Sequence, residues 1–140
     1  NNHANAISAG MAATDETADT IGGGNSQASG SVQDSLLTTS SLVSALASTN
    51  VIVTTTNASG TGIGNITVVD AITWSSGNTL TLTAANNIYL NAAITTGTAS
   101  SKLILNASGS VTQTAAIGGS GGVTQQGSGT TTLSQANTYT

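Results

Sequence analysis

The chain has no cysteine, no proline and no phenylalanine, and its 140 residues include one tryptophan and two tyrosines. The lack of cysteine excludes a disulfide framework. Aromatic side chains usually supply much of the burial in a compact globule, because each removes a large apolar area from water. The core must therefore be built from Leu, Ile, Val and Ala, which suits a narrow, repetitive interior better than a broad globular one.

Charge is also scarce, since five acids and one base give a net charge of -4, and most of the acids precede residue 35. Nucleic-acid binding requires a basic footprint, and the same lack of basic residues argues against docking to anionic lipid. No apolar run approaches the roughly 20 residues of a membrane-spanning helix, so we expect no membrane insertion. Solubility must therefore come from Thr, Ser, Asn and Gly rather than from charge.

The N-terminal part of the chain differs from the rest. Residues 1–34 hold few large aliphatics and a run of three glycines, which predicts a flexible segment or one ordered only by a partner. The first residues lack the basic and apolar regions of a signal peptide, so either a signal was removed or the chain is an excised fragment. Residues 35–50 predict a short helical turn, with Leu42 and Leu46 on one face, that caps the β region or leads into it.

Residues 51–140 carry a β pattern of short alternating apolar runs separated by Gly, Asn and Ser. Two series of aliphatic residues recur in steps of 22 and then 23: Ile66, Ile88 and Val111, and Ile72, Ile94 and Ile117. The interval from Val51 to the equivalent Leu80 is longer than these steps, and the extra residues lie in a Gly/Asn-rich insertion at residues 54–65. Three short strands in roughly 20 to 25 residues are typical of one β-helix coil. We therefore predict an all-β parallel β-helix of three to four coils.

Stacked coils would place like side chains over one another at about 4.8 Å. The predicted core ladder consists of Ile66, Ile72, Leu80, Leu82, Ile88, Leu90, Ile94, Leu103, Leu105, Val111 and Ile117. Each buried aliphatic contributes about 1.5–3 kcal/mol. Gln113 and Gln125 fall where other coils have leucine, so either buried amides pair there or the register slips.

Four segments, residues 72–82, 87–94, 109–113 and 133–140, carry a family resemblance. With them, the stretch from Ser41 to Thr140 resembles the filamentous-haemagglutinin-type repeats of large bacterial adhesins, which include two-partner-secreted exoproteins and autotransporter-like passengers. The resemblance implies a right-handed parallel β-helix, export to the bacterial cell surface, and a role in adhesion or biofilm formation. It identifies a repeat architecture and does not identify a ligand.

Residues that could carry chemistry are few. His3 is the only imidazole, and the acids within residues 15–19 lack the spaced oxygen ligands of a calcium loop. Asp70 is the only acid within the repeats and Lys102 the only base in the chain, too few for the paired acids or basic groove of a polysaccharide-cleaving β-helix. We therefore expect no enzyme activity, no catalytic or metal site and no cofactor.

Trp74 is the one residue that we single out for ligand contact. An exposed indole could stack on a sugar ring, although covering an open face beside the insertion is the favoured interpretation. Residues 79–83 alternate threonine in the manner of ice-binding solenoids, but the equivalent positions in residues 102–106 do not continue the array. Three glycosylation acceptor patterns, of the kind that chance produces in such a composition, lie at Asn57, Asn65 and Asn106.

Three functions remain open from the sequence. The first is a structural and adhesive segment, the stalk of a haemagglutinin-like surface protein. The second is a self-assembling extracellular filament subunit that polymerises through its open coil edges, with residues 1–34 covering or entering the next subunit. The third and weakest is a carbohydrate-binding solenoid that uses Trp74. The expected partners are neighbouring coils, copies of the chain, or a host-surface glycan or protein.

Overall fold

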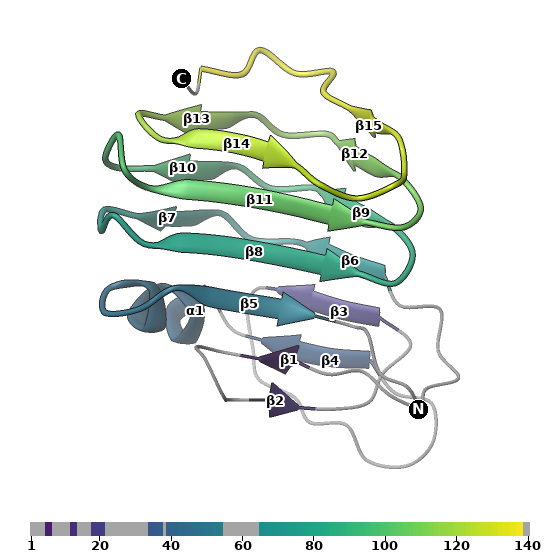
Figure 1. Cartoon of the computed structure of the whole chain (residues 1–140), viewed down its shortest axis with the longest axis horizontal. Coiled ribbons are helices and arrows are strands. Elements are labelled where there is room, and N and C mark those ends of the chain that lie inside the picture. The colour runs from purple at the N-terminus through teal and green to yellow at the C-terminus, as the bar shows by residue number, and fades with distance from the viewer. Residues whose placement is uncertain are drawn as a thin grey trace.

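The protein is described by a computed structural model at residues 5–6, 12–13, 18–21, 34–37, 39–54 and 65–138 (Figure 1). This part of the chain is mostly β and contains three parallel sheets. The predictions of a flexible or partner-ordered segment over residues 1–34 and of an insertion at 54–65 fall largely on residues outside these ranges.

The sheets contain four, six and three strands, with a separate antiparallel pair, β1 (Asn5–Ala6) and β2 (Ala12–Ala13). The four-stranded sheet comprises β5 (Val51–Thr54), β8 (Thr79–Ala84), β11 (Lys102–Ala107) and β14 (Gly122–Gln125). The six-stranded sheet comprises β4 (Asp34–Leu37), β3 (Ala18–Ile21), β6 (Asn65–Val68), β9 (Ile88–Leu90), β12 (Val111–Gln113) and β15 (Thr131–Thr132). The three-stranded sheet comprises β7 (Ile72–Trp74), β10 (Ile94–Thr96) and β13 (Ile117–Gly119).

From β5 onward the chain visits the four-, six- and three-stranded sheets in turn and then returns one strand further along. We call one such passage a rung. Three rungs are complete in the described residues, and β14 and β15 belong to a fourth (Figure 1). The prediction of a largely β fold with parallel strands is confirmed, and the arrangement is consistent with a parallel β-solenoid.

The strand register follows the spacing of the aliphatic residues. Leu80 pairs with Leu103, and Ile88 lies between Ile66 and Val111. Ile72, Ile94 and Ile117 align in the same way. All eleven residues of the predicted core ladder are at most 1% exposed. Because successive side chains of a strand point to opposite faces, alternation within each rung produces a continuous aliphatic interior.

Helix α1 (Thr39–Leu46) lies within the range where the sequence predicts a helical turn, and it packs against β5 and β7. Leu42 and Leu46 are fully buried in the same core as the strands. The backbone oxygen of Leu46, at the end of the helix, accepts hydrogen bonds from Ser76 Oγ and from Asn78 Nδ2, the latter at 2.7 Å. The helix therefore closes the interior on the N-terminal side of the rungs.

Asparagine side chains link the corners of successive rungs. Asn65 Oδ1 accepts a hydrogen bond from the Asn87 backbone N–H at 3.0 Å, and Asn87 Oδ1 accepts one from the Ser110 N–H at 2.8 Å. Each bond satisfies a backbone donor just before a strand of the next rung. These bonds help to fix the register between rungs at the entrance to the six-stranded sheet.

Candidate functional site

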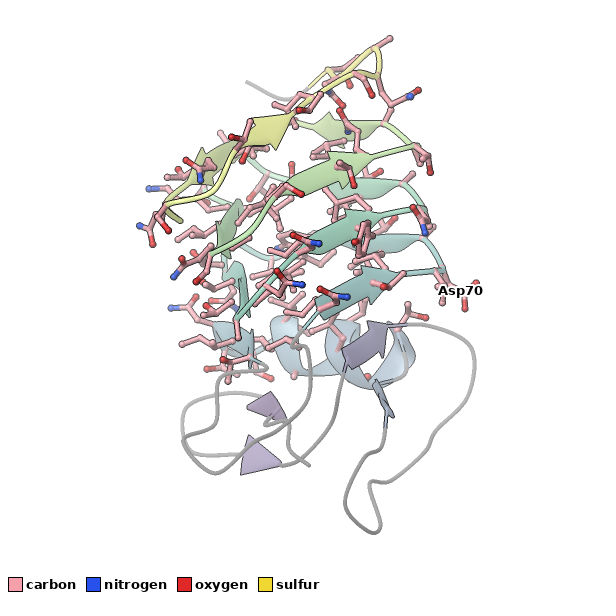
Figure 2. The ribbon with its side chains drawn as sticks, turned by 90° about the vertical axis from the view of Figure 1, so that its right-hand side faces the viewer. Asp70 is labelled. Atoms are coloured by element: carbon pink, nitrogen blue, oxygen red, sulfur yellow. The ribbon has the colours of Figure 1, made fainter. Side chains whose placement is uncertain are left out.

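Ionisable groups do not gather anywhere in the described structure. Those residues contain no group of three or more His, Cys, Asp or Glu side chains that could hold a metal ion. Asp70 is exposed just after β6 (Figure 2), whereas Lys102 is exposed at the start of β11 in a different sheet. The side chains of His3 and of residues 15–19 lie outside the described part. Among the described residues, no helix is long and apolar enough to span a bilayer.

Trp74 is buried, with 2% of its surface exposed. It is the last residue of β7, and the alternation of that strand points Ile72 and Trp74 inward and Thr73 outward. Its indole N–H donates to the Asn78 backbone oxygen at 2.9 Å. Trp74 is therefore not the exposed indole that stacking on a sugar ring would require, and its ring packs in the interior beside α1.

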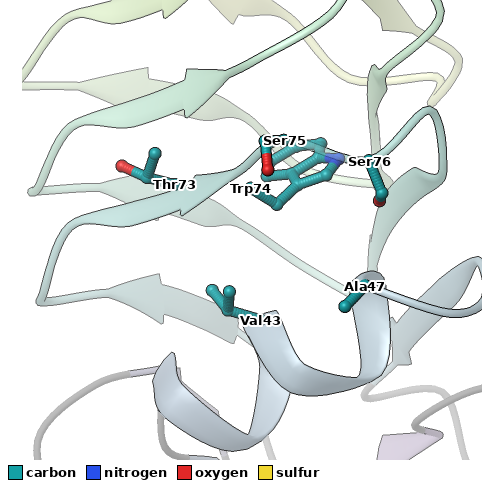
Figure 3. A pocket seen from close by; sticks show the side chains of 6 residues that line it. All are labelled: Val43, Ala47, Thr73, Trp74, Ser75 and Ser76. Carbon is teal, nitrogen blue, oxygen red and sulfur yellow. The ribbon is translucent and has the colours of Figure 1, made fainter.

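A partly open pocket of about 280 Å³ lies between α1 and the corner that follows β7 (Figure 3). Its lining consists of Val43, Ala47, Thr73, Trp74, Ser75 and Ser76. The helix supplies small apolar groups and the corner supplies hydroxyls, while no ionisable side chain lines the pocket. It therefore contains no group for acid–base chemistry.

Gln113 shows how the interior accommodates an amide in place of leucine. It pairs with Leu90 in the register and is 4% exposed. Its Nε2 donates to the Ala115 backbone oxygen at 2.9 Å and to Asn137 Oδ1 at 3.0 Å, and its Oε1 accepts from Asn137 Nδ2 at 3.0 Å. The buried amide thus has partners and the register is kept, which resolves the alternatives left open by the sequence. Gln125, its counterpart in the leucine column of the four-stranded sheet, is exposed.

The rung of β14 and β15 forms an open end. Within the described residues, β13, β14 and β15 each pair with a strand on one side only. Leu133 is 38% exposed there, and Val123 is only partly buried. Residues 117–138 contain no charged residue and no proline, the groups that usually protect a sheet edge from further pairing.

The outward positions of the six-stranded sheet form a row made of Thr67, Tyr89, Thr112 and Thr132. Tyr89 lies between the inward residues Ile88 and Leu90 and is partly exposed. Asn87 Nδ2 donates to the phenol oxygen of Tyr89 at 2.9 Å. Sequence reasoning placed Tyr89 in a strand without assigning it to a site. The signal was available, because the alternation of that strand requires Tyr89 to point outward.

The remaining surface predictions concern the four-stranded sheet and the acceptor asparagines. Residues 79–83 pair with Lys102, Ile104 and Asn106 at the outward positions, so the threonine array ends after one strand, as predicted. Asn106 is partly exposed on β11. Asn65 Oδ1 is occupied by hydrogen bonds from Asn86 and Asn87, and Asn57 lies outside the described residues.

The surface features on which a function can be based are thus the pocket beside α1, the open end of the stack and the outward row that contains Tyr89. Comparison of the chain with protein-family models, with curated proteins and with solved structures gives no match. A function must therefore be argued from geometry and chemistry.

Proposed function

We propose that this chain is a structural and adhesive segment of an exported bacterial surface protein, in which a β-helix serves as a rigid stalk. The proposal includes a right-handed helix of three to four coils of about 20 to 25 residues, an extracellular location, and membership of the filamentous-haemagglutinin-like repeats that the sequence resembles. Its biological setting would be adhesion or biofilm formation.

The in-register aliphatic interior is the observation that supports a stalk most directly. Leu103 pairs with Leu80 on one side and with Val123 on the other, so the rung of β11 is bonded to both of its neighbours. In such a quasi-one-dimensional architecture, length is added by repetition and every rung contacts only adjacent rungs. The outward rows of hydroxyl and amide groups supply a neutral surface for contact with other surfaces.

Retention of protein-coated beads on a cell monolayer or on glass under flow tests the proposal. Beads that carry the chain should be retained more than uncoated beads. Leu103→Asp, which places a charge in the interior, should abolish this gain, whereas Ile104→Asp, the same change at the adjacent outward position, should preserve the fold. Equal retention of coated and uncoated beads on both surfaces would contradict the adhesive role.

The open end favours self-assembly into filaments as a second candidate. Strands β14 and β15 pair with a strand on one side only, and they lack charge and proline, so a second copy can approach without repulsion. Wild-type protein should then form concentration-dependent assemblies in sedimentation and electron microscopy, and Thr124→Lys on β14 should suppress them. Monomers at all concentrations would eliminate this candidate.

A further inference from the structure

We propose that the outer face of the six-stranded sheet around Tyr89 is a binding site for a neutral oligosaccharide. We define the Tyr89 face as the outward residues Thr67, Asn87, Tyr89, Asn91 and Thr112. The proposal rests on the adhesive part of the function proposed above, which it deepens by naming a ligand class and a site.

The first argument is the placement of the aromatic ring. Among the side chains described, Trp74 is buried, whereas Tyr89 points outward and is partly exposed. Its neighbours in the row, Thr67 and Thr112, are much shorter and lie about 4.8 Å away on either side. The phenol ring therefore offers apolar surface to the C–H groups of a sugar, with hydroxyls beside it.

The second argument is that the ring is held in place. Asn87 Nδ2 donates to the phenol oxygen at 2.9 Å, while Asn87 Oδ1 accepts from the backbone N–H of Ser110 on the next rung at 2.8 Å. The amide thus ties Tyr89 to the backbone of the stack, which lowers the entropy lost when a ligand orders the ring. Because the phenol oxygen is the acceptor in this bond, its own O–H remains a donor for a ligand.

The third argument concerns the polar groups around the ring. Asn91 is exposed two residues after Tyr89, and its Oδ1 accepts a hydrogen bond from Thr114 on the next rung at 3.3 Å. Asn87 lies two residues before the ring, so planar amides flank it along the strand direction. Amides and hydroxyls supply both donors and acceptors, which matches the mixed hydrogen-bonding character of sugar hydroxyls.

The lack of charge on the Tyr89 face indicates the class of ligand. No residue of the Tyr89 face is ionisable apart from the phenol itself, and Lys102 belongs to the four-stranded sheet. Asp70 follows β6 at a corner and carries the wrong sign to attract an anionic polymer (Figure 2). Sulfated or uronic-acid glycans and nucleic acids would find no basic group on this face to pair with their charges, so a neutral oligosaccharide fits best.

Binding of cellohexaose, laminarihexaose, mannohexaose and chitohexaose by the whole chain, followed by calorimetry and by NMR of the Tyr89 ring, tests the proposal. We expect at least one of them to bind and a hyaluronan oligosaccharide, the anionic comparator, to bind at least about tenfold more weakly. Tyr89→Thr should weaken binding by at least about tenfold. This variant should fold, because threonine already occupies the same position on both adjacent rungs. Ile104→Thr, an outward change on the other sheet, is the matched control and should bind as the wild type does.

The proposal fails if none of the four neutral oligosaccharides binds, if hyaluronan binds equally well, or if Tyr89→Thr binds as tightly as the wild type. The bead assay separates this failure from that of the adhesive role. If the oligosaccharide measurements fail in one of these ways while wild-type beads are still retained, the glycan site is wrong and adhesion stands. If wild-type beads are not retained at all, the adhesive role itself is wrong.

Discussion

Gly119 combines a positive φ with a close backbone neighbour, so the fold depends there on the missing side chain. Its φ is +107°, and an added Cβ would lie 1.9 Å from the Thr96 backbone oxygen on the preceding rung. We expect Gly119→Ala to lower the free energy of unfolding by at least about 1–3 kcal/mol, because the strained conformation and the clash act together. Urea unfolding followed by circular dichroism measures the loss.

Gly118→Ala is the appropriate comparison for Gly119→Ala. There the added Cβ would meet only the hydroxyl of Thr138, at 2.7 Å, and this flexible side chain can turn away. A small effect at position 118 together with a large one at 119 is the expected result. Equal losses at the two positions would show that the backbone at Gly119 is not constrained as described.

At this same scale, the sequence predicted the interior better than the surface. Aliphatic residues that recur with a fixed spacing identify inward positions, and every residue of the predicted ladder is buried for this reason. Trp74 could not be placed in this way, because it pairs with Thr96, which in turn pairs with Gly119, and both are too small to indicate an interior column. Its burial depends on the packing of the rung against α1, which no spacing encodes.

Helix α1 makes a prediction at the level of secondary-structure elements. Leu42 is fully buried where the helix covers the first rung, so Leu42→Ala should cost about 2–5 kcal/mol of local stability. Hydrogen exchange should accelerate for amides of β5 and β7 and much less for those of β11 and β12, because each rung contacts only its neighbours. Uniform acceleration in all strands would instead indicate a single cooperative unit.

The corner asparagines give a second prediction for the elements. Asn65 Oδ1 accepts hydrogen bonds from the Asn87 N–H and from Asn86 Nδ2. Asn65→Ala leaves both donors unpaired and should cost about 1–3 kcal/mol. Asn65→Asp keeps the acceptor oxygen and should restore most of the stability in thermal unfolding. If both variants lose the same stability, the Asn65 side-chain oxygen does not stabilise the fold by accepting the hydrogen bond from the Asn87 backbone N–H.

The order of most strands was predictable from sequence, whereas that of the early ones was not. From β5 onward, spacing alone fixes which strands are neighbours. Strand β3 lies between β6 and β4, although both of these follow it in the chain. Residues 18–21 share no spacing with the repeats, so nothing in the sequence pattern could place them in the six-stranded sheet.

For the molecule as a whole, the scarcity of charge predicts a stability that is insensitive to salt. The chain has only six ionisable acids and bases apart from histidine and tyrosine. We expect the free energy of unfolding to change by less than about 1 kcal/mol between about 0.05 and 0.5 M sodium chloride, because few charge pairs exist to be screened. Chemical denaturation at several salt concentrations would reveal a larger change if hidden ion pairs mattered.

The two ends of the stack differ. Helix α1 packs over one end, whereas β14 and β15 at the other end pair with a strand on one side only. Further β-structure that joins the last rung would pair with β14 and β15, which act as a template for its alignment. Growth would then be directional, and each added rung would take its strand register from the rung below it. Because α1 covers only one end, an assembly that grows at the last rung would have two different ends.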